Sequence, residues 1–242
     1  MKRILITGAL GYIGTELCKL YSGFSWKYEV TAIDNRFISE RVNELKRRKI
    51  KFILADILNF DLIKHHVEKA EVVHHLAGIT DVAYVKKEID KKKDELTKKV
   101  AIEGTGNVLQ AMNKNAMIVF PSTHVVFEGL KERKENLDEN EKTNTLLVYS
   151  STKVENENQI KKSGKRYVIF RLGSVYGFST DTMRINIMPN LFSKIASQNG
   201  KIKLYGGGSQ LKSLVPLIDV ARCFKYAEEK KNIDNGIYNL TK

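Results

Sequence analysis

The sequence is poor in the residues that build disulfide scaffolds and extended linkers. Its 242 residues include two cysteines, three prolines and one tryptophan. Cys18 and Cys223 lie far apart in apolar patterns, which argues against a disulfide framework and predicts a reduced, cytoplasmic compartment. We find no internal repeat, low-complexity tract or proline-rich linker, so any second lobe should grow directly out of the first domain.

Long apolar runs are also missing. No stretch approaches the roughly 20 apolar residues that a membrane-spanning helix needs, so no membrane partner is expected. The basic start, Lys2 and Arg3, is followed by an apolar run too short for a signal peptide. Hydrophobic residues still make up 42% of the chain, which excludes wholesale disorder and suffices for one well-packed domain, alone or with a small appendage.

Acidic residues are outnumbered by basic ones, 28 to 41, which gives a formal net charge of +13. A basic surface can bind nucleic acid. The basic residues in 41–51, 86–99 and 161–166 are nevertheless spread over several predicted helices, are mostly interrupted by acidic residues, and lack interleaved aromatics. We therefore expect solvated helix faces, no nucleic-acid partner, and a mild attraction for anionic small molecules such as nucleotides.

Apolar, β-branched segments alternate with segments of helical period up to about Gly177. The pattern predicts strands at 2–7, 29–34, 51–56, 72–77, 116–121 and 167–172. It predicts helices at 13–21, 39–49, 62–69, 94–113 and 150–163. Strands that are apolar throughout and are separated by helices indicate an α/β fold with a doubly wound parallel sheet. Such a fold binds its ligand at the carboxyl ends of the strands.

The regular alternation of predicted strands and helices ends after Gly177. The sequence there predicts a helix at 191–198, a short strand at 201–204, a flexible turn at 206–209, a helix at 219–230 and a last strand at 236–240. We interpret residues 1–177 as a Rossmann-type domain and residues 178–242 as a small, shortened lobe.

Three glycines, Gly8, Gly11 and Gly14, follow the first strand and open the first helix. Glycine allows a tight turn and a close approach of backbone to a diphosphate, and the helix start offers free N–H groups to it. Asp34 ends the second strand, where a carboxylate accepts hydrogen bonds from the adenosine ribose and repels a 2′-phosphate, which favours NAD over NADP. A packing turn and a helix cap are the alternative interpretations of these residues.

Tyr149 and Lys153 are four residues apart on a predicted helix, so the phenol and the ammonium share a face. The cation lowers the phenol pKa, and the phenolate can then take a proton from a substrate hydroxyl. Two other pairs, Tyr226 with Lys230 and Tyr238 with Lys242, have the same spacing. We interpret both as coincidental, because only Tyr149 opens the helix that follows the fifth strand.

These motifs together resemble the extended short-chain dehydrogenase/reductases, the NAD-dependent nucleotide-sugar epimerase and dehydratase group, over nearly the whole chain. The segments that carry the resemblance are 8–14, 54–57, 75–78, 121–127, 149–153, 171–177 and 204–221. The resemblance implies catalytic roles for Thr123, Tyr149 and Lys153, and substrate contacts for Thr123, His124, Ser174 and Lys212. It implies NAD contacts for Gly8, Gly11, Tyr12, Ile13, Gly14, Asp34, Asn35, Asp56, Ile57, Leu76, Ala77, Gly78, Tyr149 and Lys153. A turn-capping hydroxyl is the alternative role for Thr123.

Five positions depart from the family pattern. Ala101 and Ser174 stand where asparagine is usual. Lys212 stands where arginine is usual, so the bidentate binding of phosphate by a guanidinium is replaced by contact with a single ammonium. His124 and Val125 occupy the positions of the Asp-Glu pair of the 4,6-dehydratases. Without those carboxylates the acid and base of dehydration are missing, which argues against that activity.

The resemblance therefore implies an NAD-dependent epimerase that acts on a nucleotide-diphosphate sugar, through a keto intermediate, as a homodimer. An NAD(P)-dependent sugar-nucleotide dehydrogenase or reductase, and a non-catalytic dinucleotide-binding protein, are the alternatives. No metal site is expected, because adjacent His74 and His75 would point to opposite faces of a strand. Family members continue beyond the last strand, so we expect either a truncated form or a minimal variant with an open substrate site.

Overall fold

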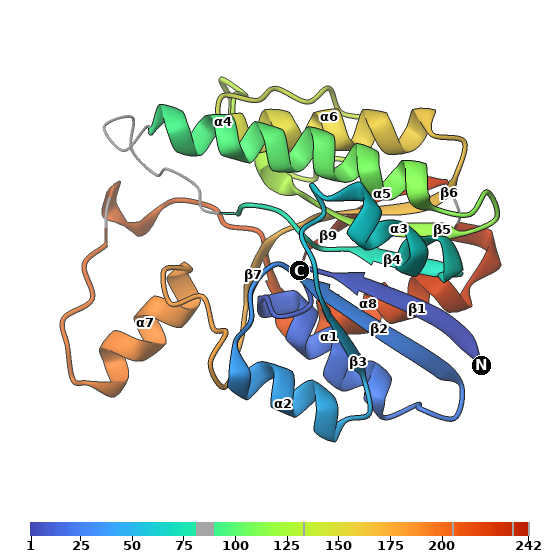
Figure 1. Cartoon of the computed structure of the whole chain (residues 1–242). Helices are drawn as coiled ribbons and strands as arrows, with labels where there is room; N and C mark the ends of the chain where they lie inside the picture. Colours follow the sequence, from blue (N-terminus) through green and yellow to red (C-terminus); the bar gives the residue numbers. More distant parts are fainter. Residues whose placement is uncertain (81–89, 133, 205, 234, 242) are drawn as a thin grey trace.

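The computed structural model describes residues 1–80, 90–132, 134–204, 206–233 and 235–241 (Figure 1). Its centre is a seven-stranded sheet in the order β3-β2-β1-β4-β5-β6-β9, and every neighbouring pair in it is parallel. The strands are β1 (Lys2–Thr7), β2 (Tyr28–Asp34), β3 (Lys51–Leu54), β4 (Val72–His75), β5 (Met117–Thr123), β6 (Arg166–Leu172) and β9 (Gly236–Leu240). The predicted doubly wound parallel sheet is confirmed.

Helices cover both faces of the sheet because its strands are apolar on both sides. Ile4 and Ile6 face a core shared with α1 and α8, whereas Leu5 faces a second core shared with α3, α5 and α6. The helices are α1 (Tyr12–Ser22), α2 (Ser39–Arg47), α3 (Phe60–Lys69), α4 (Lys91–Lys99), α5 (Thr105–Ala111), α6 (Val148–Lys162), α7 (Met188–Ser197) and α8 (Leu217–Glu229). In the described part of the chain, none of these is long and apolar enough to cross a membrane.

The helix predicted at 94–113 is divided into three pieces. One π-helical turn, Val100–Gly104, separates α4 from α5. Side chains of α6 compensate for the distorted backbone: Asn156 Nδ2 donates to the Ala101 carbonyl at 2.8 Å, and Gln159 Nε2 donates to the Ile102 carbonyl at 3.2 Å. The helical period in the sequence does not reveal these contacts. Of the basic segment 86–99, residues 86–89 lie outside the described residues.

The chain after β6 differs most from expectation. The strand predicted at 201–204 is wrong, since these residues are irregular and exposed, and no strand of the described chain lies beside them. The turn expected at 206–209 is a single 3₁₀ turn, Gly206–Gly208. Two short strands that were not predicted, β7 (Ser174–Tyr176) and β8 (Leu214–Pro216), pair in parallel as a second sheet.

The last two elements return to the main sheet. The strand β9 pairs with β6, and α8 packs against α1 in the first core. The sequence-based division had assigned both elements to the smaller lobe. Between β7 and β8, the helix α7 stands apart from the sheet (Figure 1).

The turn after β1 is built on close backbone contacts. Gly8 has φ of 65°, and a Cβ there would lie 2.7 Å from the Ala77 nitrogen. A Cβ at Gly14 would lie 2.4 Å from the Gly8 carbonyl oxygen. The start of α1 therefore packs directly on the turn that precedes it.

We expect Gly14→Ala and Gly106→Ala to change the free energy of unfolding in opposite directions. Gly106 lies in α5, and a Cβ there would meet no atom within 4 Å. Alanine at this position should raise the free energy of unfolding by about 0.5–1 kcal/mol through its higher helix propensity. At Gly14 the overlap with backbone should lower it by about 1–3 kcal/mol. Urea denaturation followed by circular dichroism measures both, and equal effects would show that the turn has room to relax.

Candidate active site

One large cleft, of about 1660 Å³, opens at the carboxyl ends of the parallel strands. Every residue that the sequence assigned to cofactor, substrate or catalysis lines it. These residues are Gly8, Gly11, Tyr12, Ile13, Gly14, Asp34, Asn35, Asp56, Ile57, Leu76, Ala77, Gly78, Thr123, His124, Tyr149, Lys153, Ser174 and Lys212. The structure thus brings them together, and the role of each stays a prediction.

The glycine turn and the acid at the end of β2 form one unit. The Leu10 amide donates to Asp34 Oδ2 at 3.0 Å, and the Ala9 amide donates to the Ile33 carbonyl at 3.1 Å. Arg36 donates to Asp34 Oδ1 from its amide at 3.1 Å and from Nε at 3.0 Å. Asp34 is therefore buried and oriented, with its charge partly balanced by the Arg36 guanidinium.

Similar contacts hold the next two loops of the cleft. Asp56 Oδ2 accepts from Asn35 Nδ2 at 3.0 Å, and its Oδ1 accepts from the Leu58 amide at 2.9 Å. Thr7 Oγ1 accepts from the Ala77 amide at 3.1 Å and contacts His75 Nδ1 at 2.9 Å. The loops after β3 and β4 are thereby fixed to their neighbours before any ligand enters.

These features fit a dinucleotide. The turn has no room for side chains at Gly8 and Gly14, so the backbone is bare where a diphosphate approaches. The first amides of α1 lack helical partners and carry the positive end of the helix dipole. Asp34 and Asp56 are held on the adjoining strand ends, within reach of a ribose and a base.

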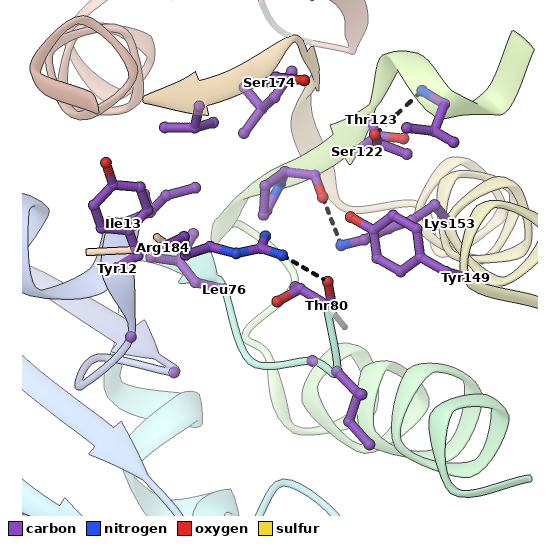
Figure 2. Close-up of a pocket in the computed structure, with 18 of the residues that line it drawn as sticks. Tyr12, Ile13, Leu76, Thr80, Ser122, Thr123, Tyr149, Lys153, Ser174 and Arg184 are labelled. Carbon is purple, nitrogen blue, oxygen red and sulfur yellow. Dashed lines mark hydrogen bonds between the residues drawn. The ribbon is translucent and has the colours of Figure 1, made fainter. Parts of the chain in front are cut away.

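The candidate catalytic residues lie where β5 ends and where α6 begins (Figure 2). Tyr149 and Lys153 lie one turn apart near the start of α6, and the Lys153 Nζ is 5.9 Å from the Tyr149 ring centroid. Thr123, at the end of β5, accepts a hydrogen bond from the Val125 amide at 3.2 Å. Its hydroxyl proton stays available for an oxygen atom in the cleft.

The Lys153 ammonium is taken out of water. Its Nζ donates to the Pro121 carbonyl at 2.7 Å and lies 4.4 Å from the Phe120 ring centroid. Burial lowers the pKa of Lys153 to about 8, and the nearby Glu157 carboxylate opposes that shift. Near neutral pH the lysine therefore holds a poorly solvated charge beside the Tyr149 phenol.

A buried ion pair lies behind these residues. Arg171 of β6 donates to Glu157 of α6 from Nε at 3.0 Å and from Nη2 at 2.8 Å. Ser122 Oγ donates to the same carboxylate at 2.5 Å. Ser122 is thus committed to Glu157, which leaves Thr123 as the hydroxyl directed at the cleft. Sequence reasoning missed Glu157, although its position one turn after Lys153 was a usable signal.

His124, the residue after Thr123, is another predicted substrate contact that lines the cleft. His124 Nδ1 is 2.9 Å from the Leu172 carbonyl, so its proton sits on Nδ1 and its Nε2 is the remaining acceptor. Burial lowers the pKa of His124, and Lys212 lowers it further. Ser174 and the exposed Lys212 line the same cleft.

The other candidates of the sequence lie elsewhere. Tyr226 is 52% exposed on α8, and Tyr238 packs against the first core and donates to the Ile233 carbonyl. Lys242, the partner by spacing of Tyr238, is outside the described residues. His74 contacts Tyr21 whereas His75 contacts Thr7, on opposite faces of β4 as strand alternation requires. Within the described ranges, no group of histidine, cysteine and acidic side chains could hold a metal ion.

Sequence reasoning missed several charged residues that line the cleft. Among them are Arg41 of α2 and two residues of the segment between β7 and α7, Asp181 and Arg184. No local pattern marks them, because the contact between Arg41 and Asp181 joins positions 140 residues apart.

The parallel sheet has a glycine turn, two hydrogen-bonded carboxylates and a Tyr-Lys pair at the carboxyl ends of its strands. These features define a Rossmann-type, dinucleotide-dependent enzyme. The chain belongs to the NAD dependent epimerase/dehydratase family, whose model matches residues 4–241. It is an enzyme of that family, whose cofactor is NAD.

Individual relatives agree with this assignment. The chain is 30% identical over 237 residues to a putative UDP-glucose 4-epimerase of Methanocaldococcus jannaschii, covering 95% of this chain and 74% of that one. It is 26% identical to the dTDP-4-dehydrorhamnose reductase of Aggregatibacter actinomycetemcomitans, covering 100% of this chain and 74% of the reductase. The structure of UDP-glucuronic acid 4-epimerase from Bacillus cereus in complex with NAD superposes with a TM-score of 0.82 at 27% identity, covering 99% of this chain and 78% of that one.

Cofactor preference should follow from Asp34. We expect NAD to bind at least about tenfold more tightly than NADP, because the buried carboxylate repels a 2′-phosphate. Asp34→Ala should shrink this difference, and Arg36→Ala should widen it by removing the balancing cation. Isothermal titration with both cofactors measures the ratio. Equal affinities in the unaltered protein would contradict the assignment of Asp34.

Lys153→Met should stabilise the protein while it removes the ammonium from the site. The pKa of Lys153 is lower in the folded than in the unfolded state, so its cost to stability is fully present below pH 8 and is relieved as the pH rises towards 10.5. At pH 7 we expect the variant to gain about 1–3 kcal/mol in free energy of unfolding. Urea denaturation at pH 7 and pH 9.5 should show that the gain shrinks at the higher pH. A gain independent of pH would mean that packing alone is responsible.

Proposed function

We propose that the protein is an NAD-dependent epimerase of a nucleotide-diphosphate sugar. The observation that carries the proposal is the convergence of Thr123, Tyr149 and Lys153 in the cleft that holds the glycine turn and Asp34. The similarity to UDP-sugar epimerases supports the substrate class. The sugar itself and the homodimer expected from the resemblance remain predictions.

Tyr149 acts as the proton acceptor in this proposal. The Lys153 ammonium stabilises the phenolate, because the charge is buried and only weakly screened. The Thr123 hydroxyl donates a hydrogen bond to the substrate oxygen that loses its proton to Tyr149. NAD, when bound, would supply a reversible hydride acceptor for the carbon that bears this oxygen.

Inversion requires that the keto sugar rotates in the cleft between the two hydride transfers. The keto sugar then accepts hydride on its opposite face, and Tyr149 returns the proton to the same oxygen. We propose that Lys212 and Ser174 hold the diphosphate and the sugar while this happens. The segment between β7 and β8, residues 177–213, would form the lobe that recognises the sugar.

One-way reduction of a keto sugar is the second candidate. It is favoured by the similarity to a dTDP-4-dehydrorhamnose reductase, and the same proton donor and cation would serve it. The two reactions differ in the fate of the cofactor, since a reductase must exchange it in every turnover whereas an epimerase keeps it.

A screen of UDP-, GDP- and dTDP-sugars with the NAD-loaded protein tests the proposal. We expect one sugar nucleotide to change configuration at a hydroxyl-bearing ring carbon without net formation of NADH. Tyr149→Phe should lower kcat at least about 1000-fold while the affinity for NAD stays within a factor of about two. The proton acceptor is lost, but the cleft keeps its shape.

Tyr226→Phe and Tyr238→Phe are the matched controls, since each removes one phenol hydroxyl from a residue outside the cleft. Both should leave kcat close to that of the unaltered protein. Loss of activity in either control would move the proton acceptor away from Tyr149. Stoichiometric conversion of NADH to NAD with a keto-sugar substrate would support the reductase instead.

A further inference from the structure

The segment between β7 and α7, residues 178–187, runs along the mouth of the cleft. It contains turns and no helix or strand. Its cleft-lining residues are Asp181, Thr182, Met183, Arg184 and Ile187. These residues face the same space as the glycine turn, although their place in the chain is in the smaller lobe.

Side chains from the first half of the chain attach this segment at several points. Arg41 Nε donates to Asp181 Oδ2 at 2.5 Å, and its Nη2 donates to the Asp181 carbonyl at 3.0 Å. A third donor of the same guanidinium, Nη1, reaches the Leu10 carbonyl of the glycine turn at 2.7 Å. One arginine therefore connects the turn that receives a diphosphate to the segment that lies above it.

Two residues of α1 add further attachments. Tyr12 Oη donates at 2.5 Å to the carbonyl of Gly177, which directly precedes the segment, and the Thr15 and Thr182 hydroxyls lie 3.2 Å apart. Both Tyr12 and Thr15 belong to the first turn of α1. The segment is thus fixed directly beside the helix start, where the free backbone amides are.

Arg184 connects the segment to a further loop of the cleft. It extends past Tyr12 and Ile13 toward the loop after β4, where its Nη2 donates to the Thr80 carbonyl at 3.1 Å (Figure 2). Its other guanidinium N–H groups have no protein partner among the residues that the structure describes. A cation with free donors therefore spans the cleft opposite the positive end of α1.

We propose that residues 178–187 form a strap over the diphosphate of NAD, with Arg184 as the side chain that contacts that diphosphate. A guanidinium offers paired N–H donors to phosphate oxygens. The guanidinium of Arg184 lies in the same cleft as the start of α1. The strap holds NAD in place, since release requires the contacts of Arg184 and of Asp181 to open together. Its link to epimerisation, which needs the cofactor retained between two hydride transfers, rests on the proposed function.

Dissociation and association of radiolabelled NAD, measured by rapid filtration without any sugar, test the strap separately from the reaction. Arg184→Ala should weaken NAD affinity about 10- to 100-fold, mostly through faster dissociation, because a charge-assisted contact is lost. Arg184→Lys should restore part of the affinity. Asp181→Ala removes an anchor but no contact to phosphate, so it should speed association and dissociation alike and change the affinity by less than about threefold.

Three comparisons make the outcome decisive. Arg222→Ala, which removes an exposed arginine on α8 paired with Asp219 of its own helix, should change neither rate. Urea denaturation midpoints show whether each variant is folded as well as the unaltered protein. The affinity for UDP separates the two diphosphates that enter such a cleft. If Arg184→Ala leaves NAD dissociation unchanged, or weakens UDP while sparing NAD, the strap does not act on the cofactor and the inference is overturned.

Discussion

The buried carboxylate of Glu157 is the constraint on which the site depends. It lies at the interface of α6 with β5 and β6, and it accepts hydrogen bonds from Arg171 and Ser122. A charge in this position is tolerated only because three donors from two strands satisfy it, and removal of any partner would leave a desolvated group. The ion pair therefore fixes both the rotation of α6 and its distance from the sheet. Glu157, Lys153 and Tyr149 are spaced four residues apart, so one fixed carboxylate sets the direction of all three side chains.

The rest of the cleft is assembled by the same means, with polar groups joining loops that are distant in sequence. Asp34 holds the glycine turn through the Leu10 amide, Asp56 holds its own loop, and Thr7 holds the loop after β4. The glycine turn and the loop after β4 are each held by a hydrogen bond to a neighbouring strand end, and Asn35 links Asp56 to the end of β2. Preorganisation of this kind reduces the ordering that a ligand must impose on binding, which favours tight association with a cofactor.

Local patterns in the sequence predicted most of the sheet and most of the candidate site. The apolar runs at 2–7 and 236–240 became β1 and β9 with the same bounds, and the spacing of Gly8, Gly11 and Gly14 located the turn, because backbone geometry there admits no side chain. Features that depend on contacts across the fold were missed. The π-helical turn at 100–104 is compensated by Asn156 and Gln159 of another helix, and β7 and β8 are three-residue strands that each exist only because the other is present. Arg184 lies in a segment without periodicity, so only its position in space shows that it belongs to the cleft.

The packing of α8 on α1 also orders events during synthesis on the ribosome. Residues such as Leu17 and Tyr21 on α1 are covered by Val220, Phe224 and Ala227, which are translated about 200 positions later. Until α8 emerges, the first core of a nascent chain has an open apolar side, although β1 and β2 can already pair. Such a chain presents a hydrophobic surface until α8 has been made, and its sheet is complete only when β9 has joined β6. The first core is therefore complete only after α8 has been translated, and a chaperone that binds nascent apolar helices would have its longest opportunity at α1.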